Sequence, residues 1–195
     1  MKVGLVSDTH SYLDPRLCEL LDGVGKILHA GDVGSQRVLD HLSLVAPTAA
    51  VKGNVDSPDL NLPLSLTLQV EGVQVEIRHI LPALPSQLES WSRAKLLQKA
   101  DLVERDRFLE CFQPSTRVVL FGHSHEPCLV CLTNRLFVNP GSAGKKRFAL
   151  PRCCGVMEIA RDELEVKILL LEDYNRSVPE PVHLRFKRYV YREKH

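Results

Sequence analysis

Side chains capable of binding metal ions recur in this chain directly after short apolar runs. Five such runs end in a carboxylate, an imidazole or a side-chain amide, and three of the polar segments begin with glycine. The side chains are Asp8, His10, Asp32, Asn54, His79, His123 and His125. One Gly-Asp or one strand-end histidine is more typical of a turn or a satisfied core residue. Five apolar runs that all end this way indicate a shared site.

The chemistry of this set favours transition metals. Carboxylate, amide oxygen and imidazole together suit Mn, Fe, Zn or Ni better than Ca or Mg, and the set contains no cysteine, which excludes a thiolate site. Seven ligands are too many for one ion but fit two if one carboxylate is shared. Two ions about 3.5–4 Å apart are the usual arrangement for in-line displacement at phosphorus.

The spacing within two of the motifs makes a local prediction. Asp8 and His10 are two residues apart, and so are His123 and His125. Alternate side chains of an extended backbone point the same way. Each pair is therefore expected to face one spot at the end of its strand. For "GHSH" alone, the alternative is two solvated loop histidines.

The first part of the chain has the pattern that would bring these motifs together. Asp14-Pro15 and Ser35 are expected to begin helices, and apolar residues recur at helical spacing after each. Strands are expected at 2–7, 26–30 and 48–52. Such a βαβαβ order favours parallel strands, and ligands of open sheets gather beyond the carboxyl ends of such strands.

The second part is richer in strands. Residues 64–79 show period-two alternation around a Glu71-Gly72 turn, which predicts a hairpin, and residues 86–112 are expected to be helical. Short strands are expected at 117–121, 128–132, 135–138, 153–159 and 164–171. The change from a parallel opening to a strand-rich second half predicts two packed sheets with helices outside.

Composition narrows the function classes. The net charge of +1 argues against a nucleic-acid footprint over the whole chain. Residues 183–195 hold five Lys or Arg and one Glu, a net charge of +4 that leaves −3 for residues 1–182. This basic and aromatic tail favours an edge strand or a subunit contact in a homo-oligomer over nucleic-acid binding.

Targeting signals and nucleotide-binding loops are not found in the sequence. No segment has the length of a signal peptide or a membrane span, and six scattered cysteines suit reduced thiols, so a cytoplasmic location is expected. No Gly-rich phosphate-binding loop follows the first strand, which argues against a plain nucleotide-binding domain.

The order of the motifs resembles a known family. D-x-H, G-D, G-N-x-D, a lone histidine and G-H-x-H occur in this order in calcineurin-like metallophosphoesterases. The YfcE-like phosphodiesterase subgroup is similar also in "GDVGSQRVLDHL", "GNVD" and "VNPGSAGKKR". The resemblance covers residues 1–171 and leaves 172–195 as a connector and tail. It implies an α/β fold, a four-layer α/β/β/α sandwich of two mixed sheets with flanking helices.

The resemblance also implies roles for the ligand residues. Asp8, His10 and His125 would hold a first metal, Asn54, His79 and His123 a second, and Asp32 would bridge them. A hydroxide between the two divalent ions, most readily Mn²⁺ with Ni²⁺, Fe²⁺, Zn²⁺ or Co²⁺ as alternatives, would attack a small phosphodiester in line. Asp32, Asn54 and His123 are thereby the expected catalytic residues.

Other positions are assigned from the same resemblance. Lys146 and Arg147 are expected to contact a substrate phosphate, with a solvated basic turn as the alternative for Lys146 and its neighbour Lys145. His29 and Asp56 are expected to orient ligands, and for His29 the alternative is a packed core histidine. In many relatives a histidine at the position of Val55 acts as a general acid near the leaving group. Valine cannot donate a proton.

Two alternatives to a phosphodiesterase remain. A phosphomonoesterase or nucleotide hydrolase would use the same centre. A non-catalytic scaffold is the other, because the fold also occurs as a protein-interaction subunit of the retromer coat.

Overall fold

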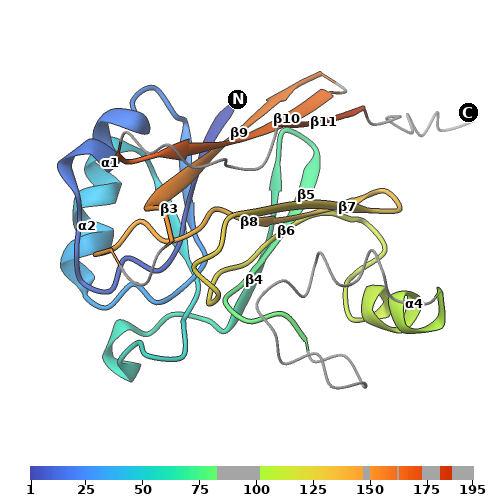
Figure 1. The fold of residues 1–195 in the computed structure, drawn as a ribbon, viewed down its shortest axis with the longest axis horizontal. Helices are drawn as coiled ribbons and strands as arrows, with labels where there is room; N and C mark the ends of the chain where they lie inside the picture. The colour runs from blue at the N-terminus through green and yellow to red at the C-terminus, as the bar shows by residue number, and fades with distance from the viewer. Residues whose placement is uncertain (83–101, 147–149, 162, 173–180, 186–195) are drawn as a thin grey trace, which may run out of the picture.

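The first sheet combines parallel and antiparallel strands. In the computed structural model, which describes residues 1–82, 102–146, 150–161, 163–172 and 181–185, its order is β11-β10-β9-β1-β2-β3 (Figure 1). Its strands are β1 (Lys2–Val6), β2 (Lys26–His29), β3 (Thr48–Ala50), β9 (Cys153–Ala160), β10 (Glu163–Leu170) and β11 (Val182–Arg185). The strands β1, β2 and β3 are parallel, as the βαβαβ pattern predicts, and the others add antiparallel.

The second sheet is mixed as well, with the order β4-β5-β6-β8-β7. Its strands are β4 (Ser65–Val70), β5 (Val73–Arg78), β6 (Thr116–Leu120), β7 (Cys128–Leu132) and β8 (Arg135–Asn139). The predicted hairpin is the antiparallel pair β4–β5, and β5 is parallel to β6, so both β5 and β6 carry their carboxyl ends to one edge.

The sheets pack face to face because side chains alternate along their strands. Leu5 and Leu28 of the first sheet meet Ile77 and Leu120 of the second in a core that excludes water. Val6, the next residue of β1, points to the opposite face. Burial of both faces of β1 explains why "KVGLV" is a continuous apolar run rather than an alternating one.

Helices cover the outer faces of both sheets (Figure 1). The helices α1 (Pro15–Leu20) and α2 (Gln36–Val45) place Leu17 and Leu42 on the first sheet. On the second sheet, α4 (Leu102–Glu110) places Phe108 against Phe137. A short 3₁₀ turn, η1 (Pro58–Leu60), follows β3. The expectation of two packed mixed sheets with flanking helices is confirmed.

Two sequence expectations reach beyond the described residues. Of the helix expected over 86–112, residues 86–101 lie outside them, and the described part, α4, ends at Glu110. Of the tail, residues 182–185 pair with β10 as an edge strand, and 186–195 lie outside. The nucleic-acid and subunit-contact roles of the tail, and the domain boundary at residue 171, stay predictions.

Candidate metal centre

The polar motifs follow the carboxyl ends of β1, β2, β3, β5 and β6, and backbone hydrogen bonds hold these loops together. The amides of Asp8 and His10 donate to the carbonyls of Gly31 and Asp32, at 3.0 and 2.9 Å. Within the second sheet, Gly122 N donates to His79 O at 3.0 Å, and between the sheets His123 N donates to Asp8 Oδ2 at 3.2 Å. The seven side chains predicted as ligands are thereby brought to one place.

Three of these side chains form a first group, defined as Asp8, His10 and His125. His125 Nε2 lies 3.2 Å from Asp8 Oδ1 and 3.3 Å from His10 Nε2. Asp8 is fully buried, His125 is buried, and His10 is partly exposed. One ligand atom of each lies within 4.8 Å of the others, which is the spacing of a metal site.

A second group consists of Asn54, His79 and His123. Asn54 Oδ1 lies 3.0 Å from His79 Nε2 and 3.0 Å from His123 Nδ1. His79 is buried, whereas Asn54 and His123 are exposed. This group therefore faces solvent on one side.

The carboxylate of Asp32 lies between the two groups. Its Oδ2 is 3.8 Å from His10 Nε2 and 3.3 Å from His79 Nε2. Its other oxygen, Oδ1, accepts a hydrogen bond from Val55 N at 3.0 Å. One oxygen is thus shared by the groups while the other fixes the side chain.

The backbone at these residues is not extended, which corrects the prediction drawn from the i, i+2 spacing. Asp8, His10, Asp32, His123 and His125 have φ between 49 and 70°, in the left-handed region. This conformation costs non-glycine residues about 1–2 kcal/mol each. His123 joins the second group and His125 the first, instead of both facing one spot, whereas Asp8 and His10 do meet in the first group as predicted.

The donor set fits divalent cations. Asp8 Oδ2 accepts from Ser7 Oγ at 2.6 Å and from His123 N at 3.2 Å, but the buried Oδ1 accepts no hydrogen bond. A buried carboxylate oxygen without a donor is costly, and a cation seated among Oδ1 and the imidazoles would satisfy it. Oxygen and imidazole donors without sulfur suit Mn²⁺, Fe²⁺, Zn²⁺ or Ni²⁺.

The imidazole of His79 is oriented by the protein. Its Nδ1 donates to Ala30 O at 2.8 Å, which leaves Nε2 facing Asn54 and Asp32. Burial lowers the pKa of His79, but the hydrogen bond with Asp32 and the charges of Asp8 and Asp32 outweigh it, so the pKa lies above its usual value. Burial raises the pKa of Asp32, but its hydrogen bonds with His79 and the Val55 amide and the charge of His79 outweigh burial. The pKa of Asp32 therefore lies below its usual value.

Asp56 braces two of the ligand loops. Its Oδ1 accepts from Gly34 N at 2.6 Å, and its Oδ2 from Val33 N at 3.1 Å and Gly53 N at 2.8 Å. The carboxylate thereby joins the loop that carries Asp32 to the one that carries Asn54. This geometry suits the positioning role expected for Asp56.

His29 is both a core histidine and a brace. It is fully buried, and burial lowers its pKa to about 4, so the ring is neutral at pH 7. Its Nδ1 accepts from Gly31 N at 3.2 Å, and its Nε2 lies 3.0 Å from Thr9 Oγ1. The ring therefore joins the loop between Asp8 and His10 to the one before Asp32.

The sequence reasoning did not find the polar residues that support Asp8 and the histidine loop. Ser142 Oγ donates to Asp8 O at 2.9 Å, and Asn139 Nδ2 donates to Gly122 O and Ser124 Oγ, both at 2.9 Å. These residues lie in "VNPGSAG". Asn139 could have been found from the same signal as Asn54, an Asn at the end of an apolar run, whereas Ser142 has no such signal.

Two motif glycines are explained by close approach. A Cβ at Gly53 would collide with the carboxylate of Asp32, and one at Gly122 would collide with Ser7 Oγ. Both motifs therefore need glycine for packing between the loops.

Of the basic residues proposed for substrate contact, the structure describes the lysines but not the arginine. Lys145 and Lys146 are exposed, and Lys145 Nζ lies 5.9 Å from the centre of the Tyr12 ring. Arg147 lies outside the described residues. Their contact with substrate remains a prediction.

Comparison with known proteins identifies the family. A calcineurin-like phosphoesterase superfamily domain matches residues 1–162. The chain belongs to this superfamily. A probable metallophosphoesterase of Methanocaldococcus jannaschii is 30% identical over 181 residues, which cover 89% of this chain and 83% of that protein. The family consists of hydrolases of phosphate esters that bind divalent metals.

Solved structures share the fold at low sequence identity. Vps29 of Entamoeba histolytica, solved in complex with Zn²⁺, is 19% identical with a TM-score of 0.68, covering 96% of this chain and 100% of that one. YfcE, a phosphoesterase of E. coli, is 22% identical with a TM-score of 0.61, covering 93% of this chain and 98% of that one.

Within the described parts of this chain, no helix is long and apolar enough to cross a membrane.

Proposed function

We propose that this protein is a phosphodiesterase that uses two divalent metal ions, with Mn²⁺ the best fit. The observation that carries the proposal is the place of Asp32, whose Oδ2 lies within 4 Å of an imidazole nitrogen of each group. One carboxylate oxygen so placed can serve two cations at once. Asp8, His10 and His125 would hold one ion, and Asn54, His79 and His123 the other.

The bound ions would supply positive charge for the phosphate oxygens and a water acidified to hydroxide. The chain's own residues prepare the site for this. The carboxylates of Asp8 and Asp32 concentrate negative charge among the imidazole ligands, which favours cations. The Ala30 carbonyl fixes the His79 ring with Nε2 toward the site, and such support typically improves metal affinity 10–100-fold.

The surroundings of the site also indicate the leaving group. Val55 is 58% exposed and adjoins Asn54, and its side chain has no proton to give. A positioned general acid typically contributes roughly 10²–10⁴-fold. Without one at this position, departure relies on the leaving oxygen's own stability, a metal ion or water, so aryl leaving groups, whose oxyanions are weak bases, are expected to be cleaved best.

Metal removal and restoration test the proposal. The chelated protein should be inactive on bis(4-nitrophenyl) phosphate, and Mn²⁺ should restore activity better than Mg²⁺ because imidazole ligands favour the softer ion. The same assay on 4-nitrophenyl phosphate compares the diester with the monoester. His123→Ala should lose activity, whereas His41→Ala, an exposed histidine on α2, should not. Full activity after verified metal removal would contradict the proposal.

A protein-interaction scaffold is the second candidate, and the fold shared with Vps29 is the observation that favours it. The complete donor set favours the enzyme, since a scaffold does not need to preserve seven converging ligands. A protein that binds two metals tightly but cleaves neither ester would support the scaffold instead.

A further inference from the structure

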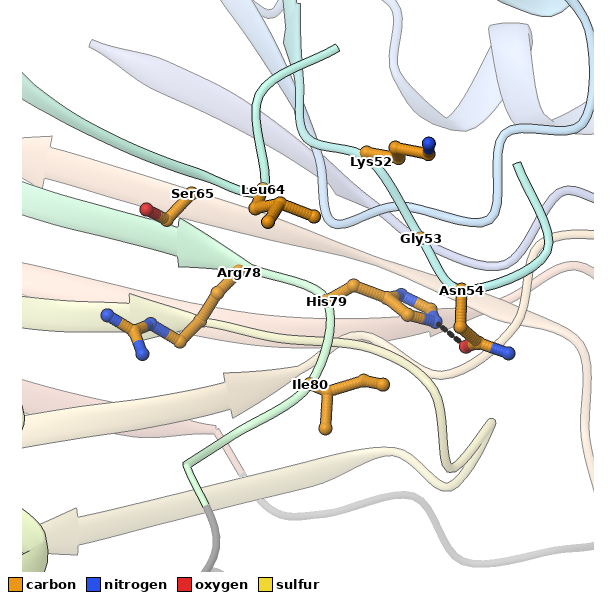
Figure 2. Close-up of a pocket in the computed structure, with 8 residues that line it drawn as sticks. All are labelled: Lys52, Gly53, Asn54, Leu64, Ser65, Arg78, His79 and Ile80. Atoms are coloured by element: carbon orange, nitrogen blue, oxygen red, sulfur yellow. Dashed lines mark hydrogen bonds between the residues drawn. The ribbon is translucent and has the colours of Figure 1, made fainter. Parts of the chain in front are cut away.

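A cavity of about 320 Å³ opens directly beside the second group (Figure 2). Asn54 and His79 form one end of it, so it is continuous with the proposed centre. Leu64, Ser65 and Ile80 also line it. The cavity lies at the lower end of the usual volume range of small-molecule sites.

Two large apolar side chains that line this cavity are exposed to solvent. Leu64 is 76% exposed and Ile80 43% exposed. Figure 2 shows them on opposite sides of the His79 ring, Leu64 above and Ile80 below in that view. Apolar side chains left in water do nothing for folding, and apolar side chains that line a cavity beside a few polar groups are typical of a ligand site.

The arginine at the cavity is occupied elsewhere. Arg78 forms an ion pair with Glu76, which is 4% exposed, and its guanidinium lies 5.1 Å from the centre of the Phe112 ring. In Figure 2 the guanidinium extends away from His79. Of the two cations that line the cavity, only Lys52 is left to influence a ligand there. The space between Leu64 and Ile80 therefore suits an uncharged apolar group.

A phosphodiester carries a second ester group that could occupy this space. In an in-line displacement the water oxygen forms the new bond to phosphorus as the bond to the leaving oxygen breaks on the opposite side. The proton released by the water ends on the leaving oxygen or in solvent. The second ester group stays on phosphorus and projects sideways from this line. It is retained in the product, a phosphate monoester.

We propose that the cavity between Leu64 and Ile80 binds the retained ester group, and that the substrates are phosphodiesters whose retained group is apolar and at least as large as a phenyl ring. This inference rests on the proposed function, because the diester is the substrate of that same centre. It adds which ester group is recognised and by which residues.

Two diesters with one leaving group test it. Phenyl 4-nitrophenyl phosphate and methyl 4-nitrophenyl phosphate differ only in the retained group. For the Mn²⁺-loaded protein, KM should be at least about tenfold lower for the phenyl ester, the discrimination expected of a small apolar contact. Leu64→Ser and Ile80→Ser should each reduce this ratio at least about threefold, with kcat nearly unchanged. Leu44→Ser, which changes an 85% exposed leucine on α2, should leave the ratio unchanged.

A binding measurement separates this inference from the proposed function. Phenylphosphonate and methylphosphonate carry a P–C bond that is not hydrolysed, and their binding to the Mn²⁺-loaded protein is measured by calorimetry. Tighter binding of phenylphosphonate that Leu64→Ser removes would support the cavity even if no diester is cleaved. Diester cleavage with equal KM for both esters, or equal binding of both phosphonates, would overturn the assignment of the cavity.

Discussion

The two groups of the centre differ in burial and in charge. The first group is buried around the Asp8 carboxylate, which is fully enclosed. The second group has a buried imidazole, His79, but Asn54 and His123 are exposed, and a cavity opens beside it. None of its own donors is a carboxylate, so any negative charge it offers a cation comes from the shared Asp32.

This difference predicts that the two groups bind their ions with different affinities. A buried carboxylate interacts more strongly with a cation than an exposed amide oxygen does, because water screens the first group less. The first group is therefore expected to bind the tighter ion. The second faces solvent and the cavity, so it is expected to bind the weaker ion and to be the side from which substrate enters.

The largest effect is expected from replacing Asp32, because its carboxylate is shared by both groups. Asp32→Asn removes the shared negative charge, and asparagine tolerates the left-handed backbone at this position (φ 52°). We expect the loss of at least one metal and a fall in kcat/KM of roughly 10²–10³-fold, the range for loss of one strong electrostatic partner. Elemental analysis and diester kinetics measure both, with Asp40→Asn on α2 as the control. Two tightly bound metals in Asp32→Asn would refute sharing.

Removing one histidine from each group tests the difference in affinity. Stepwise metal titration by calorimetry should show two binding steps in the wild type. His125→Ala should weaken the tighter step, because it opens the buried first group, and His123→Ala should weaken the looser one. If both variants lose the same step, the division between the groups is wrong.

The brace formed by Asp56 should act on both groups at once. Asp56→Asn leaves at least one of the three backbone amides it binds without an acceptor, at a cost of about 1–3 kcal/mol per amide in the free energy of unfolding. It should also weaken metal binding 10–100-fold. Denaturant unfolding and metal titration measure these effects. Asp59→Asn, at an exposed position of η1, is the matched control and should change neither.

The smallest expected effect is a pH dependence of the weaker binding step. The pKa of His79 is raised, and a metal binds only the unprotonated Nε2, so a proton and a cation compete there. Affinity for the weaker ion should rise by up to about tenfold per pH unit as pH rises toward this pKa and then level off. Calorimetry in buffers of different ionisation enthalpy would show the released proton. A weaker step that is independent of pH between 5.5 and 8 would show that His79 is not its ligand.

The sequence predicted the elements and the edge at which the polar residues meet. Apolar runs such as "KVGLV" and "RVVL" predict buried strands by composition alone, and the residue after a strand needs no tertiary information to be placed at its end. The hairpin of β4 and β5 followed from period-two alternation. These features are local, which is why one sequence is enough to predict them.

What the sequence did not predict depends on backbone conformation and on contacts between distant residues. The spacing of His123 and His125 does not predict their left-handed backbone. Spacing alone predicts that both rings face one spot, and only the family resemblance assigned them to different metals. The bond from Ser142 to Asp8 joins residues 134 positions apart. The cavity is likewise non-local, because Leu64 and Ile80 come to line the same cavity only after β4 and β5 have paired.

The left-handed residues have a consequence for protein engineering. His123 is exposed and adopts φ 70°, so His123→Gly should relieve local strain and raise the thermal stability of the metal-free protein. A laboratory selection for heat resistance in the presence of chelator would therefore favour the loss of such positions. The residues that such a selection discards first would mark, without any assay of catalysis, where the fold gives up stability to keep its ligands in place.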